Sequence, residues 1–268
     1  MKTEYVTKLL NWFEGKNSVL VALSGGVDSA LVAYSAYAKL GKSAIAVTAD
    51  YKTLAQEELE YAKKISSEIG IKHIVIEYNE LDNESFVKND NNRCFYCRSE
   101  LSQHLLQVAK EFESDMIVDG TNIDDLGDYR PGVLALRQNG IRSPLAEAGF
   151  SKKMVRETAK SVGLSVYDKP SNSCLASRIP WGQSVTAERL ARIEIGEKIV
   201  KQLTGAKQVR VRDMNGIAKI EVGVDELSLL ENNTVLQKIK DQLKLISFED
   251  VSIDPEGYRP GKINVITN

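Results

Sequence analysis

The sequence predicts an α/β protein in which a parallel sheet is followed by a smaller α+β domain. Short apolar runs, beginning at residues 19–23, alternate with segments whose apolar residues have helical spacing. Only a few residues connect each strand to the next helix, which indicates parallel βαβ units. An irregular stretch with two prolines, residues 169–180, ends this alternation. We therefore expect two domains, at residues 1–180 and 181–268.

The apolar runs and the helical spacing predict the individual elements along the chain. Apolar runs predict strands in the first domain at residues 19–23, 44–48, 73–76 and 115–119. Helical spacing predicts helices at residues 4–13, 27–40, 54–69, 99–112 and 151–162. Three of these helices end at a glycine, namely Gly41, Gly70 and Gly163. In the second domain we expect a helix at 186–203, strands at 208–212 and 218–222, a helix at 227–245 and a strand at 246–253.

The composition is that of an ordinary globular protein, with 43% hydrophobic and 27% charged residues. At 268 residues, the chain is long enough for one sizeable core and a smaller second core. A net charge of −2 lacks the basic excess of a general nucleic-acid surface, so we expect no nucleic-acid partner. No apolar run has membrane-spanning length and the first residues lack a signal-peptide core. We therefore expect no membrane partner and a cytoplasmic location.

A glycine-rich turn between the first strand and its helix is the strongest candidate for a ligand site. Ser24, Gly25 and Gly26 follow the strand directly. Backbone N–H groups of such a turn form a phosphate site, which the glycines leave accessible. Ser24 and Ser29 add hydroxyl donors, and we assign Asp28 to Mg²⁺ because a carboxylate beside phosphate needs a cation between them. The alternative is a helix capped by Ser24 or Asp28, with no ligand.

Residues after the other strands are expected to lie near this turn. In open parallel sheets, ligands bind beyond the carboxyl ends of the strands. Asp50 follows the second strand and is either a helix cap or a nucleotide contact. The acidic loop Gly120–Asp125 follows the fourth strand. Its carboxylates either help to bind Mg²⁺ or, as we favour for Asp124 and Asp125, cap a surface turn.

The three cysteines form the second informative group. An odd number of cysteines in a reducing compartment favours metal binding or catalysis over disulfides. Cys94 and Cys97, separated by two residues at the start of a helix, can reach one metal from a single turn, while Cys174 lies far along the chain. Three interpretations stay open: a structural zinc with a further ligand, a Cys94–Cys97 redox pair, or a [4Fe–4S] cluster whose open iron binds sulfide.

Two arginines stand out in the second domain. Arg210 and Arg212 alternate along a strand, so both side chains lie on one face. Two guanidinium groups on one face can bind a phosphate or a carboxylate. The alternative is a solvated surface in which they pair across the strands with Glu221.

Six strings of residues, spread over nearly the whole chain, resemble known proteins. They are Ser24–Ser29, Asp119–Gly132, Ser143–Gly149, Cys174–Pro180, Val209–Arg212 and Glu256–Arg259. The first resembles the phosphate loop of the PP-loop ATP pyrophosphatases. The second and fourth resemble the LarE family, the ATP-dependent sulfur transferases of nickel-pincer nucleotide biosynthesis. The resemblance implies a Rossmann-like PP-loop domain with a smaller C-terminal domain.

The resemblance also implies a reaction. ATP adenylates a carboxylate of pyridinium-3,5-biscarboxylic acid mononucleotide, and sulfur then displaces AMP to leave a thiocarboxylate. In one branch of the family, a sacrificial cysteine supplies the sulfur. In the other, three cysteines hold a [4Fe–4S] cluster, and Cys94, Cys97 and Cys174 match this branch. We expect sulfide or a donor protein as the sulfur source, and a homo-oligomer.

The matched strings imply further site residues. Gly120, Thr121, Ser177 and Arg178 are expected to contact the nucleotide. Arg210 and Arg212 match positions near the substrate phosphate, and Glu197 and Glu221 match metal-site positions. The rival functions are a tRNA thiolase, which calls for a basic surface, an amide-forming synthetase, which does not need the cysteines, and a zinc-stabilised nucleotide-binding protein.

Overall fold

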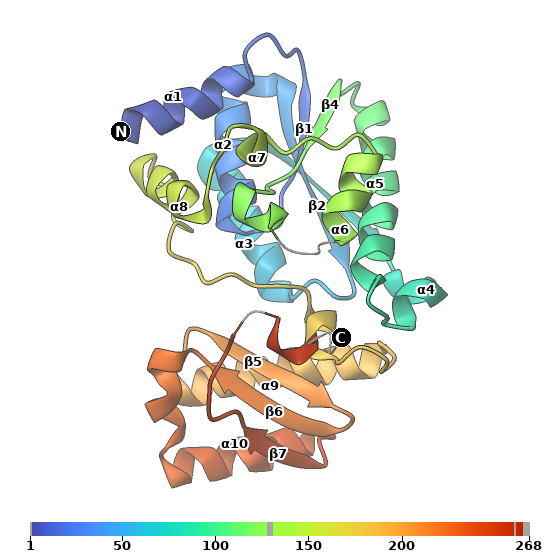
Figure 1. Ribbon diagram of the computed structural model, residues 1–268, viewed down its shortest axis with the longest axis vertical. Coiled ribbons are helices and arrows are strands. Elements are labelled where there is room, and N and C mark those ends of the chain that lie inside the picture. The colour runs from blue at the N-terminus through green and yellow to red at the C-terminus, as the bar shows by residue number, and fades with distance from the viewer. Residues whose placement is uncertain (1, 128–130, 260, 265–268) are drawn as a thin grey trace. The chain divides into compact units, whose positions relative to one another are not determined.

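The structure is a computed structural model that describes residues 2–127, 131–259 and 261–264 (Figure 1). The chain forms two compact units. The first consists of the chain up to Asn79 together with Asn92–Asn172, and the second of Glu80–Asn91 together with the chain from Ser173 onward. Both units are therefore discontinuous in sequence. The expected domain boundary after residue 180 stays a prediction.

The first unit is built on a parallel sheet, as the sequence predicts, so the α/β fold class is confirmed. Its strands have the order β3-β2-β1-β4. They are β1 Val19–Ala22, β2 Ala44–Tyr51, β3 Lys72–Tyr78 and β4 Met116–Val118. In the central strand, Val19 pairs with Ala44 on one side and with Met116 on the other. The branched residues of β1 are fully buried because helices cover both faces of the sheet.

Helices flank this sheet on both faces (Figure 1). They are α1 Lys2–Trp12, α2 Val27–Leu40, α3 Gln56–Ile69, α5 Arg93–Glu111, α6 Pro131–Gln138, α7 Pro144–Glu147 and α8 Lys152–Ser161. Val19 and Val21 point into a core shared with α1, α2, α3 and α8. Leu20, between them, points into a second core with α5 and α6. The helix α5 begins six residues before the predicted start at Ser99, so both Cys94 and Cys97 lie within it.

The second unit contains a three-stranded sheet with the order β5-β6-β7. Its elements are α4 Glu84–Val87, α9 Ala187–Thr204, β5 Val209–Met214, β6 Ile217–Val222, α10 Asn233–Leu245 and β7 Asp250–Ile253. β5 and β6 are antiparallel, whereas β6 and β7 are parallel. The predicted helix at 227–245 divides, because the side chain of Asn232 accepts hydrogen bonds from Thr234 N and Val235 N and starts a new helix there. In the part of the chain that the structure describes, no helix is long and apolar enough to cross a membrane.

Candidate functional site

The turn between β1 and α2 is held by the hydroxyl of Ser29. Ser24 N donates to Ser29 Oγ at 3.1 Å, and Ser29 Oγ donates to the Gly26 carbonyl at 3.2 Å. The Ser24 and Ser29 hydroxyls lie 3.0 Å apart. Gly26 is the residue before α2, and no side chain caps this helix. The capped-helix alternative is therefore wrong, and the first N–H groups of α2 are left for a ligand to bind.

Two glycines allow other elements to pack closely on this turn. Gly25 has a φ of +76°, and a Cβ at this position would lie 2.4 Å from the Glu58 carbonyl oxygen in α3. A Cβ on Gly120, after β4, would lie 2.7 Å from the backbone nitrogen of Ser29. Real Cβ atoms do not approach backbone this closely. Glycine at both positions therefore lets α3 and the segment after β4 contact the turn directly.

The carboxylate of Asp28 already has a cationic partner. Lys152 Nζ, in α8, forms an ion pair with Asp28 Oδ2. Asn122 Nδ2 donates to Asp28 Oδ1 at 3.1 Å, and the backbone N of Lys152 donates to Asp124 Oδ2 at 2.7 Å. The oxygens of Asp28 are hard donors of the kind that Mg²⁺ binds, and its side chain is 20% exposed, so the residue fits the predicted cation.

Sequence reasoning missed Asn122 and Lys152. Asn122 begins a short turn at Ile123–Leu126 through a capping box with Asp125, and Lys152 is the first residue of α8 after Ser151. Both were visible only as local helix-start signals. Nothing in the spacing indicates that the two meet at Asp28, because Lys152 is 124 residues away along the chain.

The segment after β4 is shaped by Asp119. Its carboxylate accepts from Thr121 N at 3.1 Å and from Thr121 Oγ1 at 2.7 Å. Burial raises the pKa of Asp119 above its ordinary value, against the opposing effect of its hydrogen bonds. The hydroxyl of Thr121, a predicted nucleotide contact, is thus engaged with Asp119. Asp50 lies at the end of β2, and α3 is preceded by Ala55, so Asp50 does not cap that helix.

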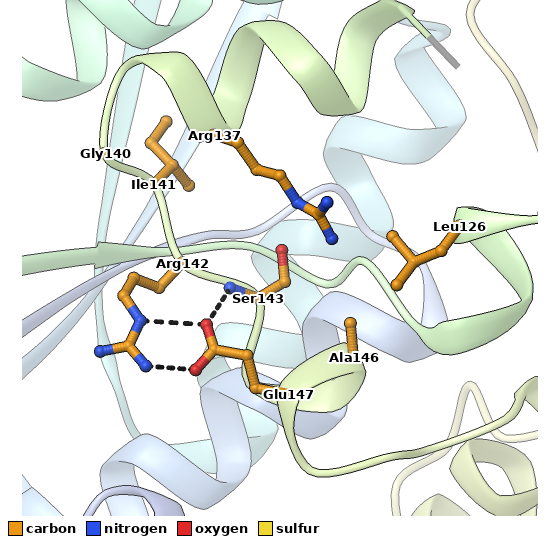
Figure 2. Close-up of a pocket in the computed structure, with 8 residues that line it drawn as sticks. All are labelled: Leu126, Arg137, Gly140, Ile141, Arg142, Ser143, Ala146 and Glu147. Atoms are coloured by element: carbon orange, nitrogen blue, oxygen red, sulfur yellow. Dashed lines mark hydrogen bonds and ion pairs between the residues drawn. The ribbon is translucent and has the colours of Figure 1, made fainter. Parts of the chain in front are cut away.

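A hollow of about 410 Å³ lies beside this segment (Figure 2). It is lined by Leu126, Arg137, Gly140, Ile141, Arg142, Ser143, Ala146 and Glu147. Glu147 is occupied, since it accepts from Arg142 Nε at 3.0 Å and from Trp12 Nε1 at 3.0 Å. The guanidinium of Arg137 points into the hollow (Figure 2). Arg137 can therefore meet an anionic group that enters it.

Cys94 and Cys97 lie one turn apart near the start of α5. Cys94 is exposed and Cys97 is buried, and Arg93 Nη2 lies 3.9 Å from Cys94 Sγ. Cys174 belongs to the second unit, where it precedes the short turn Leu175–Arg178. Among the described residues, no three His, Cys, Asp or Glu side chains form a group that could hold a metal ion. A shared cluster of the three cysteines therefore stays a prediction.

Arg178 and Glu197 form a buried ion pair in the second unit. Arg178 Nε and Nη2 donate to Glu197 Oε1 and Oε2 at 2.7 and 3.0 Å. Arg178 Nη1 also donates to the carbonyl of Cys174 at 3.0 Å and to Ser177 Oγ at 3.0 Å. Burial alone raises the pKa of Glu197, but the charge and hydrogen bonds of Arg178 lower it below its ordinary value. Arg178 thus orients the backbone of the cysteine segment.

A second ion pair lies on β5 and β6. Arg212 Nε and Nη2 donate to Glu221 Oε2 at 3.0 and 2.7 Å. The predicted pairing with Glu221 is present, but both side chains are buried, so the solvated-surface alternative is wrong. Burial and the nearby charge of Arg178 lower the pKa of Arg210 to about 10. Both Arg210 and Arg212 lie over the ring of Tyr258. Binding of a metal at Glu197 or Glu221 would require their arginines to move, and this role stays a prediction.

Comparison with known proteins covers both units. The pyridinium-3,5-bisthiocarboxylic acid mononucleotide synthase of Lactiplantibacillus plantarum is 32% identical over 92% of this chain and 88% of its own length. The chain belongs to the LarE family. A protein of Synechocystis sp. that is described only as uncharacterized is 40% identical over 96% of this chain and 95% of its own length. Residues 18–95 match the family of the queuosine biosynthesis protein QueC. The tRNA-specific 2-thiouridylase MnmA of Wolbachia pipientis is 24% identical over 84% of this chain and 70% of its own length.

Membership of the LarE family confirms the predicted family and enzyme class, an ATP-dependent sulfurtransferase. The QueC match contains the glycine turn at Ser24–Ser29 and ends between Cys94 and Cys97. Of the strings that carry the resemblance, Asp119–Gly132 includes Asp128, Tyr129 and Arg130, which lie outside the described residues.

Proposed function

We propose that this LarE-family protein adenylates pyridinium-3,5-biscarboxylic acid mononucleotide with ATP and converts its carboxylates to thiocarboxylates. The observation that carries the proposal is the 32% identity to the L. plantarum synthase, which extends over both units. The glycine turn, open at the start of α2, supports ATP as the activating substrate. Sulfide or a sulfur-donor protein supplies the sulfur.

Adenylation solves the main chemical difficulty of the reaction. A carboxylate oxygen is a poor leaving group, so the carboxylate first attacks the α-phosphorus of ATP and releases pyrophosphate. The departing charge is stabilised by N–H groups of the turn around Gly26 and by the ammonium of Lys152. Asp28 would hold Mg²⁺, which would supply positive charge to neutralise the phosphates. Sulfur then adds to the acyl carbon, and AMP leaves with the electron pair of the broken C–O bond.

Side chains of the second unit bind the substrate. Arg210 and Arg212 lie on one face of β5, and Arg210 stacks over Tyr258 at 5.0 Å from the ring centroid. Guanidinium groups bind the phosphate of a mononucleotide through parallel hydrogen bonds. Arg212 donates to Glu221 and to the Ser177 carbonyl, so it would have to leave these partners to bind that phosphate. Arg178 and Ser177 hold the segment that carries Cys174.

Cys94, Cys97 and Cys174 are proposed as ligands of a [4Fe–4S] cluster. Three thiols and no fourth cysteine suit a cluster with one open iron, which supplies a site for an exogenous sulfide. Anaerobic purification followed by iron, sulfide and zinc analysis tests this. About four irons per chain support the cluster, whereas stoichiometric zinc opposes it. Iron content should fall in Cys94→Ser, whatever the activity of that variant.

The reaction is tested with the complete protein, ATP, Mg²⁺, sulfide and the biscarboxylic mononucleotide. We expect AMP, pyrophosphate and a product in which sulfur replaces oxygen, all identified by mass spectrometry. Pyrophosphate release without any thiocarboxylate would contradict the proposed function. Because MnmA is a more distant relative, unmodified tRNA is tested in the same assay. The net charge of −2 predicts no thiolation of tRNA, and thiolated tRNA would favour that rival.

A further inference from the structure

A largely buried ion pair and a half-buried amide beside the glycine turn have no place in the mechanism above. Lys169 Nζ donates to Glu58 Oε2 at 2.5 Å, and Asn172 Nδ2 donates to Glu58 Oε1 at 2.9 Å. The side chains of Lys169 and Glu58 are only 10% and 9% exposed. Glu58 belongs to α3, whereas Lys169 and Asn172 belong to the irregular chain after α8. The cluster therefore joins two segments that are more than 100 residues apart.

The same lysine also contacts the turn itself. Lys169 Nζ donates to the Gly25 carbonyl at 2.9 Å and lies 4.0 Å from the centroid of the Tyr61 ring. Gly25 already packs against the backbone of Glu58, where a Cβ would lie 2.4 Å from the carbonyl oxygen. Gly25 is thus held from two sides, by the backbone of α3 and by the ammonium of Lys169.

This arrangement is better suited to positioning than to stability. A buried ion pair gains little over a well-packed apolar pair, because both charges lose their hydration. What it does provide is directional, charge-assisted hydrogen bonding at defined atoms. Here Lys169 donates to Glu58 and to the Gly25 carbonyl, and Asn172 donates to Glu58. Cys174 follows Asn172 by two residues.

We propose that Glu58, Lys169 and Asn172 form an anchor that positions the phosphate-binding turn and the segment leading to Cys174 against the same helix. The inference rests on the proposed function, in which the turn activates the acyl group and the Cys174 segment delivers sulfur to it. Both events concern one carbon atom, so the two segments need a common reference point. All three members are positioning residues, since they act through Gly25 and through the chain before Cys174.

Hydrogen–deuterium exchange tests the anchor without any substrate. The double variant Glu58→Gln/Lys169→Met removes both charges together and avoids leaving one of them buried alone. We expect amide exchange at residues 23–29 and 171–177 to rise about tenfold, as loss of a charged hydrogen bond allows, while residues 101–109 of α5 keep their rate. Asn172→Ala should accelerate only residues 171–177. Lys63→Met, at an exposed pair with Glu60 on the same helix, is the matched control and should change neither segment.

Activity measurements distinguish the effect of Asn172 from that of the Glu58–Lys169 pair. In Asn172→Ala, misplaced sulfur delivery leaves the adenylate to hydrolyse, so pyrophosphate released per thiocarboxylate should rise about tenfold. In the double variant, the KM for ATP should also rise. Unchanged exchange in both segments of a folded double variant would overturn the anchor, as would an unchanged pyrophosphate ratio in Asn172→Ala. A wild-type protein that forms no thiocarboxylate contradicts the proposed function instead, and the exchange results alone then decide on the anchor.

Discussion

At the residue scale, the ion pair between Asp28 and Lys152 positions two charged groups at the candidate site. Asp28 pairs with the ammonium of Lys152 and accepts a hydrogen bond from Asn122. These two contacts orient the carboxylate at the start of α2, where phosphate charge is expected and where the proposed Mg²⁺ would bind. We propose that Lys152, held in place by its ion pair with Asp28, is a second contact for the phosphates.

Replacing Asp28 tests its assignment to Mg²⁺. Asp28→Asn keeps the size of the side chain and loses the charge, so pyrophosphate release should fall about a hundredfold or more. The measurement is the rate of pyrophosphate release at saturating ATP. Asp124→Asn is the matched control, because Asp124 is a nearby carboxylate that accepts a hydrogen bond from the backbone of Lys152 and none from its ammonium group. An equal loss in both variants would argue against a special role for Asp28.

Replacing Cys174 separates the two half-reactions. Cys174→Ala removes the proposed sulfur-bearing ligand and leaves the glycine turn of the first unit intact. We expect sulfur transfer to be abolished while adenylation, followed by pyrophosphate release, persists at a similar rate. Loss of both steps to the same degree in a folded variant would contradict this separation.

At the scale of elements, the site depends on how closely β4 and α2 approach. The segment after β4 passes so near α2 that Gly120 has no room for a side chain beside Ser29 and Asp28. This contact brings Asn122 within 3.1 Å of Asp28. The carboxyl ends of β1 and β4, which pair directly in the sheet, thus build one site, as the topology of parallel sheets favours.

A single methyl group should disturb this contact. Gly120→Ala would place Cβ 2.7 Å from Ser29 N, so the segment after β4 or the start of α2 must shift. We expect the free energy of unfolding to fall by about 1–3 kcal/mol, and the affinity for ATP to fall with it. Urea unfolding and ATP titration measure the two effects. Gly127→Ala, in the same loop but with a Cβ contact no closer than 4.0 Å, should change neither.

At the scale of the whole molecule, the two units differ in how their carboxylates respond to acid. In the second unit, burial alone raises the pKa values of Glu197 and Asp213, but their arginine partners lower them below the ordinary range. In the first unit, burial raises the pKa of Asp119. The first unit also contains Glu147, whose pKa is lowered by Arg142. This ion pair is partly exposed to solvent, so it contributes less to the free energy of unfolding than the buried pairs of the second unit do.

Acid should therefore unfold the second unit first. A carboxylate with a lowered pKa stabilises the folded state above its unfolded pKa of about 4, and this stabilisation is lost as the pH falls below that value. Asp119 acts in the opposite sense, since a raised pKa favours the folded state at low pH and disfavours it as the pH rises. Each unit contains one tryptophan, Trp12 and Trp181, so Trp12→Phe and Trp181→Phe give separate fluorescence reporters. Coincident acid transitions, or earlier loss of the first unit, would contradict the prediction.

The amino-acid sequence by itself determined the local features of this protein. The strand, glycine turn and helix around Ser24–Ser29, the parallel sheet and the alternation of Arg210 and Arg212 all follow from short-range periodicity. Pairing of these arginines with Glu221 was one of two alternatives that the sequence left open. The strand, the turn, the helix and the alternation of the arginines depend on residues within a few positions of one another, where spacing alone determines which side chains share a face.

Only the tertiary structure decided which distant side chains meet. The pairs Lys152–Asp28 and Lys169–Glu58 join residues more than 100 positions apart. Arg212 and Glu221 pair as one sequence alternative had it, but the pair is buried and not on the surface. Lysine in a helix or loop pattern is usually solvated, so no local signal distinguishes one that will be buried against a carboxylate. The two lysine contacts arise because α3, α8 and the chain after α8 pack around the turn at the carboxyl edge of the first unit's sheet.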